Sequence, residues 1–474
     1  MSRRTTALAV TAALLLLAPG VPGAREQQAP PASPQKQAPP PTGTPKDFAL
    51  PKPSRFTLPN GMAVTMVPFG QVPKVTLRLV VAAGNLYEGK DEVWLADLTG
   101  RMLREGTAAR PAAEVAREFA GMGGELSVGV GSDNASLSAE VLAERGADAA
   151  RLIAEVARQP LLPAGELARV KAGLTRDLAI QRSTPQAQAQ ERFHESIYGD
   201  HPYGRLFPTE EMLNGYTIER VRTFHRARYT PAASRLYVAG VFDAAALEGA
   251  IRDAFGAWKG SAGASEVQPP TAKAERRFAL LDRPGAPQST LYLGLRVPDP
   301  SSADWVALQV TNSLLGGSFG SRITTNIREQ KGYTYSPFSA VNPHRRDAYW
   351  AEVADVTSAD TGAALKEIFS EIERLRRDPP PEGELRGIKN NMAGSFVVRN
   401  SSRQGVISQL AFVDEHGLGD GYLAGYVKRV MAVTPQEVTR VAREYLVPDR
   451  MTLVVVGDRK TVEGQLAPWS AAGQ

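Results

Sequence analysis

The segment "LPAGELARVKAGL" (residues 162–174) returns in the second half of the chain as "PPEGELRGIKNNM" (residues 380–392). Four positions are identical between the two copies: Gly165 and Gly383, Glu166 and Glu384, Leu167 and Leu385, and Lys171 and Lys389. Because the two segments are far apart along the chain, this likeness predicts that one structural unit occurs twice.

Two further pairs of segments repeat in the same order. "RFTL" at Arg55 returns as "RFAL" at Arg277, and "RYTPAASRLYVAGVFD" from Arg228 returns as "EYLVPDRMTLVVVGD" from Glu444. All three repeats are separated by 216 to 222 residues. Three matches in one order indicate an internal duplication, with each copy forming a domain.

Both periodicities of regular structure occur within each copy. Alternating apolar positions predict strands with one buried face; they are Val75, Leu77, Leu79 and Val81 in the first copy and Leu291, Leu293, Leu295 and Val297 in the second. A helical spacing follows in the second copy, through Leu365, Ile368, Phe369, Ile372 and Leu375, until Pro379 interrupts it. The sequence therefore predicts an α+β fold of two homologous domains, each a mostly antiparallel sheet with helices packed on one face.

The segments outside these copies suggest export and a tether. Residues 1–24 have two arginines, an apolar core and small residues, which is typical of a secretory signal peptide. Residues 25–52 are rich in Pro and Gln and predict an extended linker. The expected organisation is thus a signal peptide, a linker, an N-terminal domain (53–260), an interdomain linker (261–275) and a C-terminal domain (276–465).

Composition excludes several classes of function. The chain of 474 residues has no cysteine, which excludes disulfides, thiol catalysis and Cys-ligated zinc. Its formal net charge is only +5, and the basic residues are scattered, so the sequence does not suggest nucleic-acid binding. No later segment is apolar enough to predict a stable membrane span. The signal peptide predicts a bacterial protein of the periplasm or the exterior.

The stretch "VWLADLTGRMLREGT" (residues 93–107) reads as an amphipathic helix and ends in Gly106-Thr107. It resembles the metal-binding segment of the pitrilysin/insulinase-type zinc peptidases, which carry an inverted H-x-x-E-H motif on a helix. In that motif, two histidines on one helical face bind zinc and the glutamate acts on the zinc-bound water. The resemblance implies one half of a clamshell built from two such domains.

In this chain the residues at the motif positions are different. Asp97 stands at the first histidine position, Gly100 at the glutamate position and Arg101 at the second histidine position, and Asp177 lies near the expected downstream acid. An arginine has no lone pair to offer a metal, and glycine has no side chain to act as a base. We therefore expect no metal site here, and an ion pair between Asp97 and Arg101 instead.

No other part of the sequence replaces the missing metal ligands. The five histidines are separated along the chain and match no known ligand spacing, so a surface or core role is expected for each. They are His194, His201, His225, His344 and His416.

A second motif is present where the first is lost. "LLGGSFGSRITTNIREQKGYTYSPFSA" (residues 314–340) has a glycine-rich turn, then Arg328-Glu329, then Gly332 and Tyr335. The spacing of seven between the arginine and the tyrosine is similar to that in the second domain of the same peptidase family. The resemblance implies that Tyr335 and Arg328 are catalytic residues, one donating to the oxyanion and the other binding the peptide backbone.

The glycine-rich turn is predicted to bind substrate. The residues concerned are Gly316, Gly317 and Ser318, and the two glycines would let a peptide strand approach the backbone closely. An alternative interpretation gives Arg328 and Tyr335 purely structural roles, as a helix cap and a core residue.

We expect this chain to be the non-zinc subunit of a heterodimeric insulinase-like metallopeptidase, resembling one half of a bacterial or processing peptidase. It would be inactive alone and would bind no cofactor. Zinc is expected in a homologous partner subunit with an intact H-x-x-E-H motif, and the substrate would be a peptide or an unfolded protein segment. The alternatives are a non-catalytic scaffold and a stand-alone peptide-binding protein with the same fold.

Overall fold

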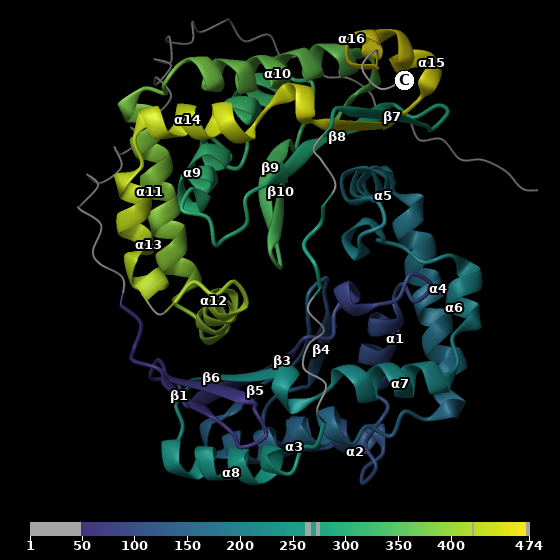
Figure 1. The fold of residues 1–474 in the computed structure, drawn as a ribbon, viewed down its shortest axis with the longest axis vertical. Helices are drawn as coiled ribbons and strands as arrows, with labels where there is room; N and C mark the ends of the chain where they lie inside the picture. The colour runs from purple at the N-terminus through teal and green to yellow at the C-terminus, as the bar shows by residue number, and fades with distance from the viewer. Residues whose placement is uncertain (1–48, 261–266, 272–274, 420, 471–474) are drawn as a thin grey trace, which may run out of the picture. The chain divides into compact units, whose positions relative to one another are not determined.

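The computed structural model describes residues 49–260, 267–271, 275–419 and 421–470. The expected signal peptide (1–24) and nearly all of the first linker (25–52) lie outside these residues. The described residues all belong to one compact unit, which contains two sheets (Figure 1). The strand order is β1-β2-β6-β3-β5-β4 in the first sheet and β7-β11-β8-β10-β9 in the second.

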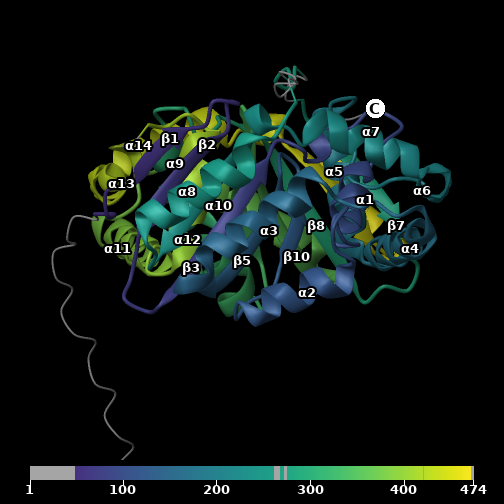
Figure 2. The same ribbon diagram turned by 90° about the horizontal axis from the view of Figure 1, so that it is seen from below.

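The first half of the chain runs from β1 to α8. Its elements are β1 (Ser54–Thr57), β2 (Ala63–Pro68), β3 (Lys74–Val81), α1 (Leu95–Met102), α2 (Ala112–Gly121), β4 (Ser127–Val130), β5 (Ala135–Leu142), α3 (Gly146–Arg158), α4 (Leu167–Ser183), α5 (Pro185–Tyr198), α6 (Glu210–Gly215), α7 (Ile218–Arg228), β6 (Ser234–Gly240) and α8 (Ala244–Gly256). Figure 2 shows α3 and α8 across one face of the first sheet, where α3 contacts β3 and β5.

The second half runs from β7 to α16. Its elements are β7 (Arg277–Asp282), β8 (Gln288–Val297), α9 (Trp305–Leu315), the π-helix η6 (Thr324–Gln330), β9 (Phe338–His344), β10 (Asp347–Thr357), α10 (Thr361–Arg377), α11 (Glu382–Arg399), α12 (Arg403–Glu415), α13 (Gly421–Ala432), α14 (Pro435–Tyr445), β11 (Thr452–Gly457), α15 (Arg459–Val462) and α16 (Ala467–Ser470). The last helix extends beyond the predicted domain end at residue 465.

The second sheet repeats the pairing pattern of the first. In both sheets one pair is parallel, β2 with β6 and β7 with β11, and the following pairs are antiparallel. Strand β1 has no counterpart in the second sheet. The predicted α+β fold with an internal duplication is therefore confirmed, and each sheet is mostly antiparallel, as expected.

One of the three sequence matches is not a structural equivalence. Arg277 begins β7, which corresponds to β2, whereas Arg55 lies in the additional strand β1. The lysine match, by contrast, marks equivalent contacts. Lys171 Nζ donates to the carbonyl oxygens of Asn214 and Tyr216, and Lys389 Nζ donates to those of Met431 and Val433. Lys171 of α4 thus binds the C-terminal end of α6, and Lys389 of α11 binds the C-terminal end of α13.

The apolar alternation places one face of each sheet in a core. Leu77, Leu79 and Val81 are fully buried in the first sheet, and Leu291 and Leu293 are almost fully buried in the second. The predicted helix through Leu365 and Leu375 is α10, and it packs into the core of the second half. Burial of these side chains is the main favourable contribution to folding.

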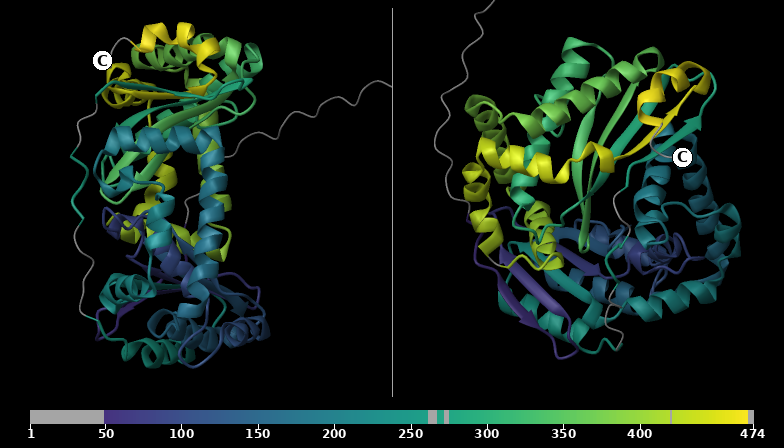
Figure 3. Two further views of the ribbon diagram at one scale, coloured as in Figure 1. Left: turned by 90° about the vertical axis from the view of Figure 1, so that its right-hand side faces the viewer. Right: turned by 45° about the horizontal axis from the view of Figure 1, so that its top comes forward.

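The other face of each sheet is covered by a helix from the other half. Helix α5 of the first half lies on β8 and β11, and helix α12 of the second half lies on β6 and β3 (Figures 1 and 3). The helices occupy equivalent places in the two repeats, with the N-caps Thr184 and Ser402. The two halves therefore contact each other through a reciprocal exchange of one helix.

The α5 interface is apolar and aromatic. The Phe193 ring lies 4.6 Å from Tyr292 and 5.8 Å from Tyr349, measured between ring centroids. At Gly294 a Cβ atom would come within 2.9 Å of Phe193 Cζ, so only glycine lets the ring lie this close to β8.

The α12 interface is more polar. Tyr237 Oη donates to Asp414 at 2.9 Å, Arg403 pairs with Glu140 at 3.0 Å, and Arg78 donates to Ser408 at 3.4 Å. A cavity of about 160 Å³ remains beside this helix, lined in part by Asp133 and Glu415. Burial, with a smaller contribution from the Asp133 carboxylate, raises the pKa of Glu415 to about 7.

The described part of the interdomain linker is bound to the protein. Arg296 donates to the carbonyl oxygen of Pro270 at 2.9 Å, and a ring nitrogen of His201 lies 3.0 Å from that of Gln268. Val267 packs against the buried cluster that contains Phe193, Tyr292 and Tyr349. Across the part of the chain that the structure describes, no helix is both long and apolar enough to cross a membrane.

The α5 interface generates a stability prediction. Phe193→Ala removes a fully buried ring from between the two halves and should lower the free energy of unfolding by about 3–5 kcal/mol. Urea denaturation followed by circular dichroism measures the change. The control is Ile180→Ala on α4, where the side chain is 64% exposed and little change is expected. A loss below about 1 kcal/mol for Phe193→Ala would contradict the assigned role.

Candidate functional site

Helix α1, at the expected metal-binding segment, is shorter than predicted. It spans Leu95–Met102, because Trp94 has a left-handed backbone (φ 67°) and lies before the helix. The buried Glu88 carboxylate accepts hydrogen bonds from the backbone N–H groups of Ala96 at 2.7 Å and Trp94 at 3.1 Å. Burial raises the pKa of Glu88 to about 8, although these hydrogen bonds favour the charged form.

Asp97, at the first histidine position, belongs to the same polar network. Its carboxylate accepts a hydrogen bond from Asn85 Nδ2 at 2.7 Å, and Asn85 also donates to Glu88 at 3.2 Å. Burial raises the pKa of Asp97 despite the opposing effects of Asn85 and the nearby Arg101. The side chain is therefore bound by an amide, not by the predicted ion pair.

Arg101, at the second histidine position, pairs with the acid expected to complete the metal site. Its Nη2 lies 2.5 Å from the Asp177 carboxylate on α4. Both side chains are nearly half exposed, so this ion pair contributes little to stability, about 0.2–1 kcal/mol. The Arg101 guanidinium thus supplies the positive charge beside Asp177 that a metal cation would supply in the motif.

Gly100, at the glutamate position, has no space for a larger residue. A Cβ atom here would come within 2.6 Å of Val130 Cγ2 on the edge strand β4. The valine side chain is stiff, so it would not move aside easily. A glutamate at this position would therefore require Val130 or the local backbone to shift.

The residues of this segment do not fit zinc. The position offers a paired arginine, an amide-bound aspartate and a glycine in contact with Val130, and none of these supplies an imidazole. Within the described ranges, no group of three or more His, Asp or Glu side chains could hold a metal ion.

Three of the five histidines are buried in the core. His194 and His225 are buried, with one ring nitrogen of each 2.9 Å from the carbonyl oxygens of Tyr203 and Ala157, respectively. Burial lowers the pKa of both, to about 4 for His194. His344 is also buried and stacks on Tyr203.

The second motif lies on η6 and the turn that follows it. Arg328 belongs to this π-helix, a rare element that is frequent at functional sites. Gly332 follows with φ 69°, and its N–H donates to the carbonyl oxygen of Arg328 at 3.2 Å. The glycine is needed because an L-residue rarely adopts this conformation.

Arg328 and Tyr335 lie together, as the motif predicts. The Arg328 guanidinium carbon is 4.9 Å from the centroid of the Tyr335 ring and 4.5 Å from that of Phe319. Tyr335 is 78% exposed, which excludes the alternative that it fills a core. Phe319 was missed in the sequence because only the glycines of its turn carried the motif; its contact with Arg328 depends on the tertiary fold.

The glycine-rich turn packs closely against its own chain. A Cβ atom at Gly316 would come within 2.5 Å of both Glu352 Oε2 and Ser339 Oγ, and one at Gly317 would collide with the Asn312 side chain. The two glycines are therefore required by local packing. Their predicted contact with substrate, and that of Ser318, stay predictions.

Glu352 on β10 is an unexpected buried acid beneath this turn. It is 1% exposed, and neither carboxylate oxygen has a hydrogen-bond partner among the described residues. Burial raises the pKa of Glu352 well above its ordinary value, because desolvation disfavours the charged form. An isolated charge here would be too costly to keep.

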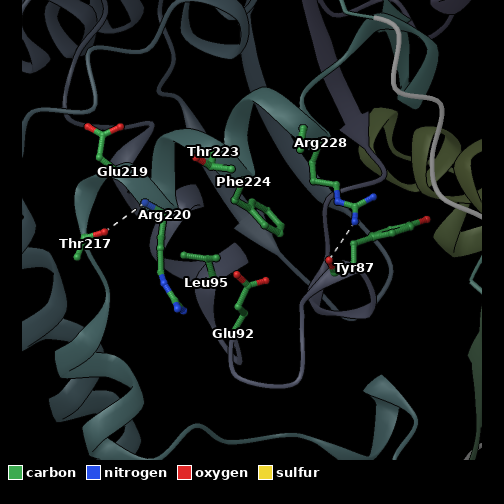
Figure 4. Close-up of a pocket in the computed structure, with 10 residues that line it drawn as sticks. Tyr87, Glu92, Leu95, Thr217, Glu219, Arg220, Thr223, Phe224 and Arg228 are labelled. Atoms are coloured by element: carbon green, nitrogen blue, oxygen red, sulfur yellow. Dashed lines mark hydrogen bonds between the residues drawn. The ribbon is translucent and has the colours of Figure 1, made fainter.

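A separate pocket of about 330 Å³ lies between α1 and α7 (Figure 4). Leu95 and Phe224 contribute apolar surface, whereas Glu92 and Arg220 contribute charge. Its lining includes Leu95 from the start of α1, but none of Asp97, Gly100 and Arg101, and neither Arg328 nor Tyr335.

The packing around Gly100 predicts a loss of stability when a larger residue stands there. Gly100→Glu should lower the free energy of unfolding by about 1–3 kcal/mol, because its Cβ atom would come within 2.6 Å of Val130 Cγ2 and overpack the contact between α1 and β4. Urea denaturation followed by circular dichroism measures the change. Val130→Ala makes room, so the same substitution should cost less in that background. An equal cost in both backgrounds would show that Val130 is not the obstacle.

Glu352 should make the protein less stable as pH rises. Its pKa is higher in the folded than in the unfolded state, so its contribution is fully present below about pH 4.5 and is lost as pH rises through the folded pKa. Glu352→Gln should therefore be closest to the wild type in stability near pH 4 and exceed it as pH rises, by up to about 1.4 kcal/mol for each pH unit between the unfolded and the folded pKa. Urea denaturation at several pH values tests this, with the exposed Glu382→Gln as control. Equal pH profiles for Glu352→Gln and the wild type would refute it.

Comparison with known proteins identifies the family. The family model described as Insulinase (Peptidase family M16) matches residues 69–208, and that described as Peptidase M16 inactive domain matches residues 215–392. An uncharacterized zinc protease of Mycobacterium tuberculosis is 25% identical over 399 residues, 83% of this chain and 91% of the relative. One of Bacillus subtilis is 24% identical over 357 residues, 75% of this chain and 86% of the relative.

Solved structures agree in fold. The peptidase M16 inactive domain from Pseudomonas fluorescens has a TM-score of 0.79 at 24% identity, covering 85% of this chain and 98% of that one. A protease from Helicobacter pylori has a TM-score of 0.80 at 20% identity, covering 86% and 100%. The two matched models together span more than half of the sequence, and the predicted resemblance is confirmed: the chain belongs to the M16, or insulinase, family of peptidases.

Proposed function

We propose that this chain is the zinc-free subunit of a two-subunit M16 metallopeptidase. It would lend Arg328 and Tyr335 to a reaction whose zinc is held by a homologous partner with an intact H-x-x-E-H motif. The observation that carries the proposal is the contrast between the two motifs. Arg101 pairs with Asp177 where the metal would lie, whereas Arg328 and Tyr335 lie together near the surface.

Each of the two side chains has a defined task in this proposal. The Tyr335 phenol would donate a hydrogen bond to the oxygen of the scissile carbonyl as negative charge develops there. Arg328 would donate to a backbone carbonyl of the peptide through its rigid set of N–H groups. This chain would supply no proton acceptor and no metal ligand; both would come from the partner.

The substrate would be a peptide or an unfolded protein segment in an extended conformation. The edge strands β4 and β9 each pair with only one neighbour in their sheets, so both are candidates for adding a substrate strand. The signal sequence at residues 1–24 supports export, and we place the protein in the periplasm or the exterior of a bacterium.

The scaffold and stand-alone binding alternatives make different predictions. A scaffold would assemble with its partner but would be insensitive to changes at Arg328 and Tyr335. A stand-alone binder would capture peptides without any partner. Size-exclusion chromatography of the chain alone and mixed with the homologous zinc-bearing subunit of the same organism distinguishes an assembling subunit from an independent one.

The central test measures peptide cleavage by the mixed subunits. With an internally quenched fluorescent peptide, Tyr335→Phe should lower kcat by about 10²–10³-fold, because one oxyanion donor is lost. Arg328→Ala should lower kcat/KM as well, since it removes a contact with the peptide backbone. The control is the exposed arginine change Arg386→Ala on α11. Undiminished cleavage by both Tyr335→Phe and Arg328→Ala would defeat the catalytic part of the proposal.

A further inference from the structure

Phe319, Arg328 and Tyr335 form an exposed cluster, here called the stack, in which one guanidinium lies over two aromatic rings. The guanidinium carbon lies 4.5 Å from the Phe319 centroid and 4.9 Å from that of Tyr335. The two rings are 72% and 78% exposed, whereas the arginine side chain is only 23% exposed. The arginine side chain is therefore much less exposed to solvent than the two aromatic residues beside it.

The stack limits how Arg328 can interact with a ligand. A guanidinium attracts aromatic rings to its faces and donates hydrogen bonds only in its plane. Within that plane, Nε already lies 3.2 Å from a carboxylate oxygen of Glu329. The terminal Nη groups are the donors best placed for an acceptor that arrives along the edge of the stack. The geometry suits a carbonyl oxygen of an extended peptide.

Phe319 is held in place by its turn. Ser321, two residues on, is 1% exposed; its N–H donates to the carbonyl oxygen of Ser318 at 3.0 Å and its hydroxyl to Thr324 at 2.9 Å. Gly316, on the other side, packs against Glu352 and Ser339. A side chain as exposed as Phe319 contributes little to folding through burial, and a second exposed ring, Tyr335, lies against the same guanidinium.

We infer that Phe319 is a positioning residue for peptide binding: it fixes the plane of the Arg328 guanidinium and offers its own ring to an apolar side chain of the bound peptide. The inference rests on the proposed function and adds to it a residue and a substrate feature. It predicts that an aromatic residue is required at position 319 and that peptides with an apolar residue beside the bound carbonyl are preferred.

The first experiment needs only the isolated chain. Phenylglyoxal modifies accessible guanidinium groups, and peptide mass spectrometry gives the rate at Arg328. Phe319→Ala should raise this rate about 2-fold or more, because one face of the guanidinium is uncovered, and Phe319→Tyr should leave it unchanged. Circular dichroism checks that both variants are folded. An unchanged rate in Phe319→Ala overturns the role of the ring in fixing Arg328.

The second experiment uses the chain mixed with its zinc-bearing homologue and two quenched peptides that differ by Leu or Ser at one position. Phe319→Ala should raise KM for the Leu peptide about 2- to 5-fold with kcat unchanged, and Phe319→Tyr should restore it. The Ser peptide should show a smaller change. The control is Val398→Ala on α11, a 71% exposed residue.

Different results would contradict the role of Phe319 and the proposed function. If Tyr335→Phe lowers kcat but Phe319→Ala leaves KM unchanged for both peptides, the role of Phe319 is wrong and the proposed function stands. If Tyr335→Phe and Arg328→Ala also leave cleavage unchanged, the proposed function itself is wrong.

Discussion

The reciprocal covering of each sheet by a helix from the other half is the interaction on which this structure depends. Helices α5 and α12 bury sheet faces that would otherwise expose residues such as Tyr292 and Val454 in one half and Tyr237 and Ala239 in the other. Exposing such faces to water would be unfavourable in proportion to their apolar area. The two repeats are therefore joined by their packing as well as by their linker, and this packing sets the framework that carries η6 and the glycine-rich turn.

The altered metal segment shows how a site is lost without loss of the fold. Asp177 is an acid near the place where the family has one, and it is satisfied by Arg101 instead of a cation. The buried Glu88 and Asp97 are satisfied by backbone N–H groups and by Asn85. Buried polar groups are costly when they have no partner, and each of these three acids has one. For Glu352 the described residues supply no such partner, and burial raises its pKa, which favours the neutral acid.

Sequence reasoning was accurate where one residue type dictates a local feature. The alternation through Leu77 and Leu79 predicted a buried strand face, and Arg101 excluded a metal ligand before any geometry was known. It failed where distant segments meet. The pairing of Arg101 with Asp177 replaced the expected local pair with Asp97, and the stacking of Phe319 on Arg328 depends on how the turn folds back on η6. The short match at Arg55 was misleading because four similar residues do not define a register.

The duplicated architecture has a consequence for how the two halves could diverge. In a symmetric dimer of identical chains, any substitution appears at both interfaces at once. Here the two copies are encoded separately, so a change on one side need not be accepted on the other. The fifth residue of the corresponding strands is Arg78 in β3 and Tyr292 in β8, and counted from the N-caps Ala411 of α12 stands where α5 has Phe193. Covalent fusion thus allows one interface to be mainly aromatic while its counterpart has charged side chains and a cavity of about 160 Å³.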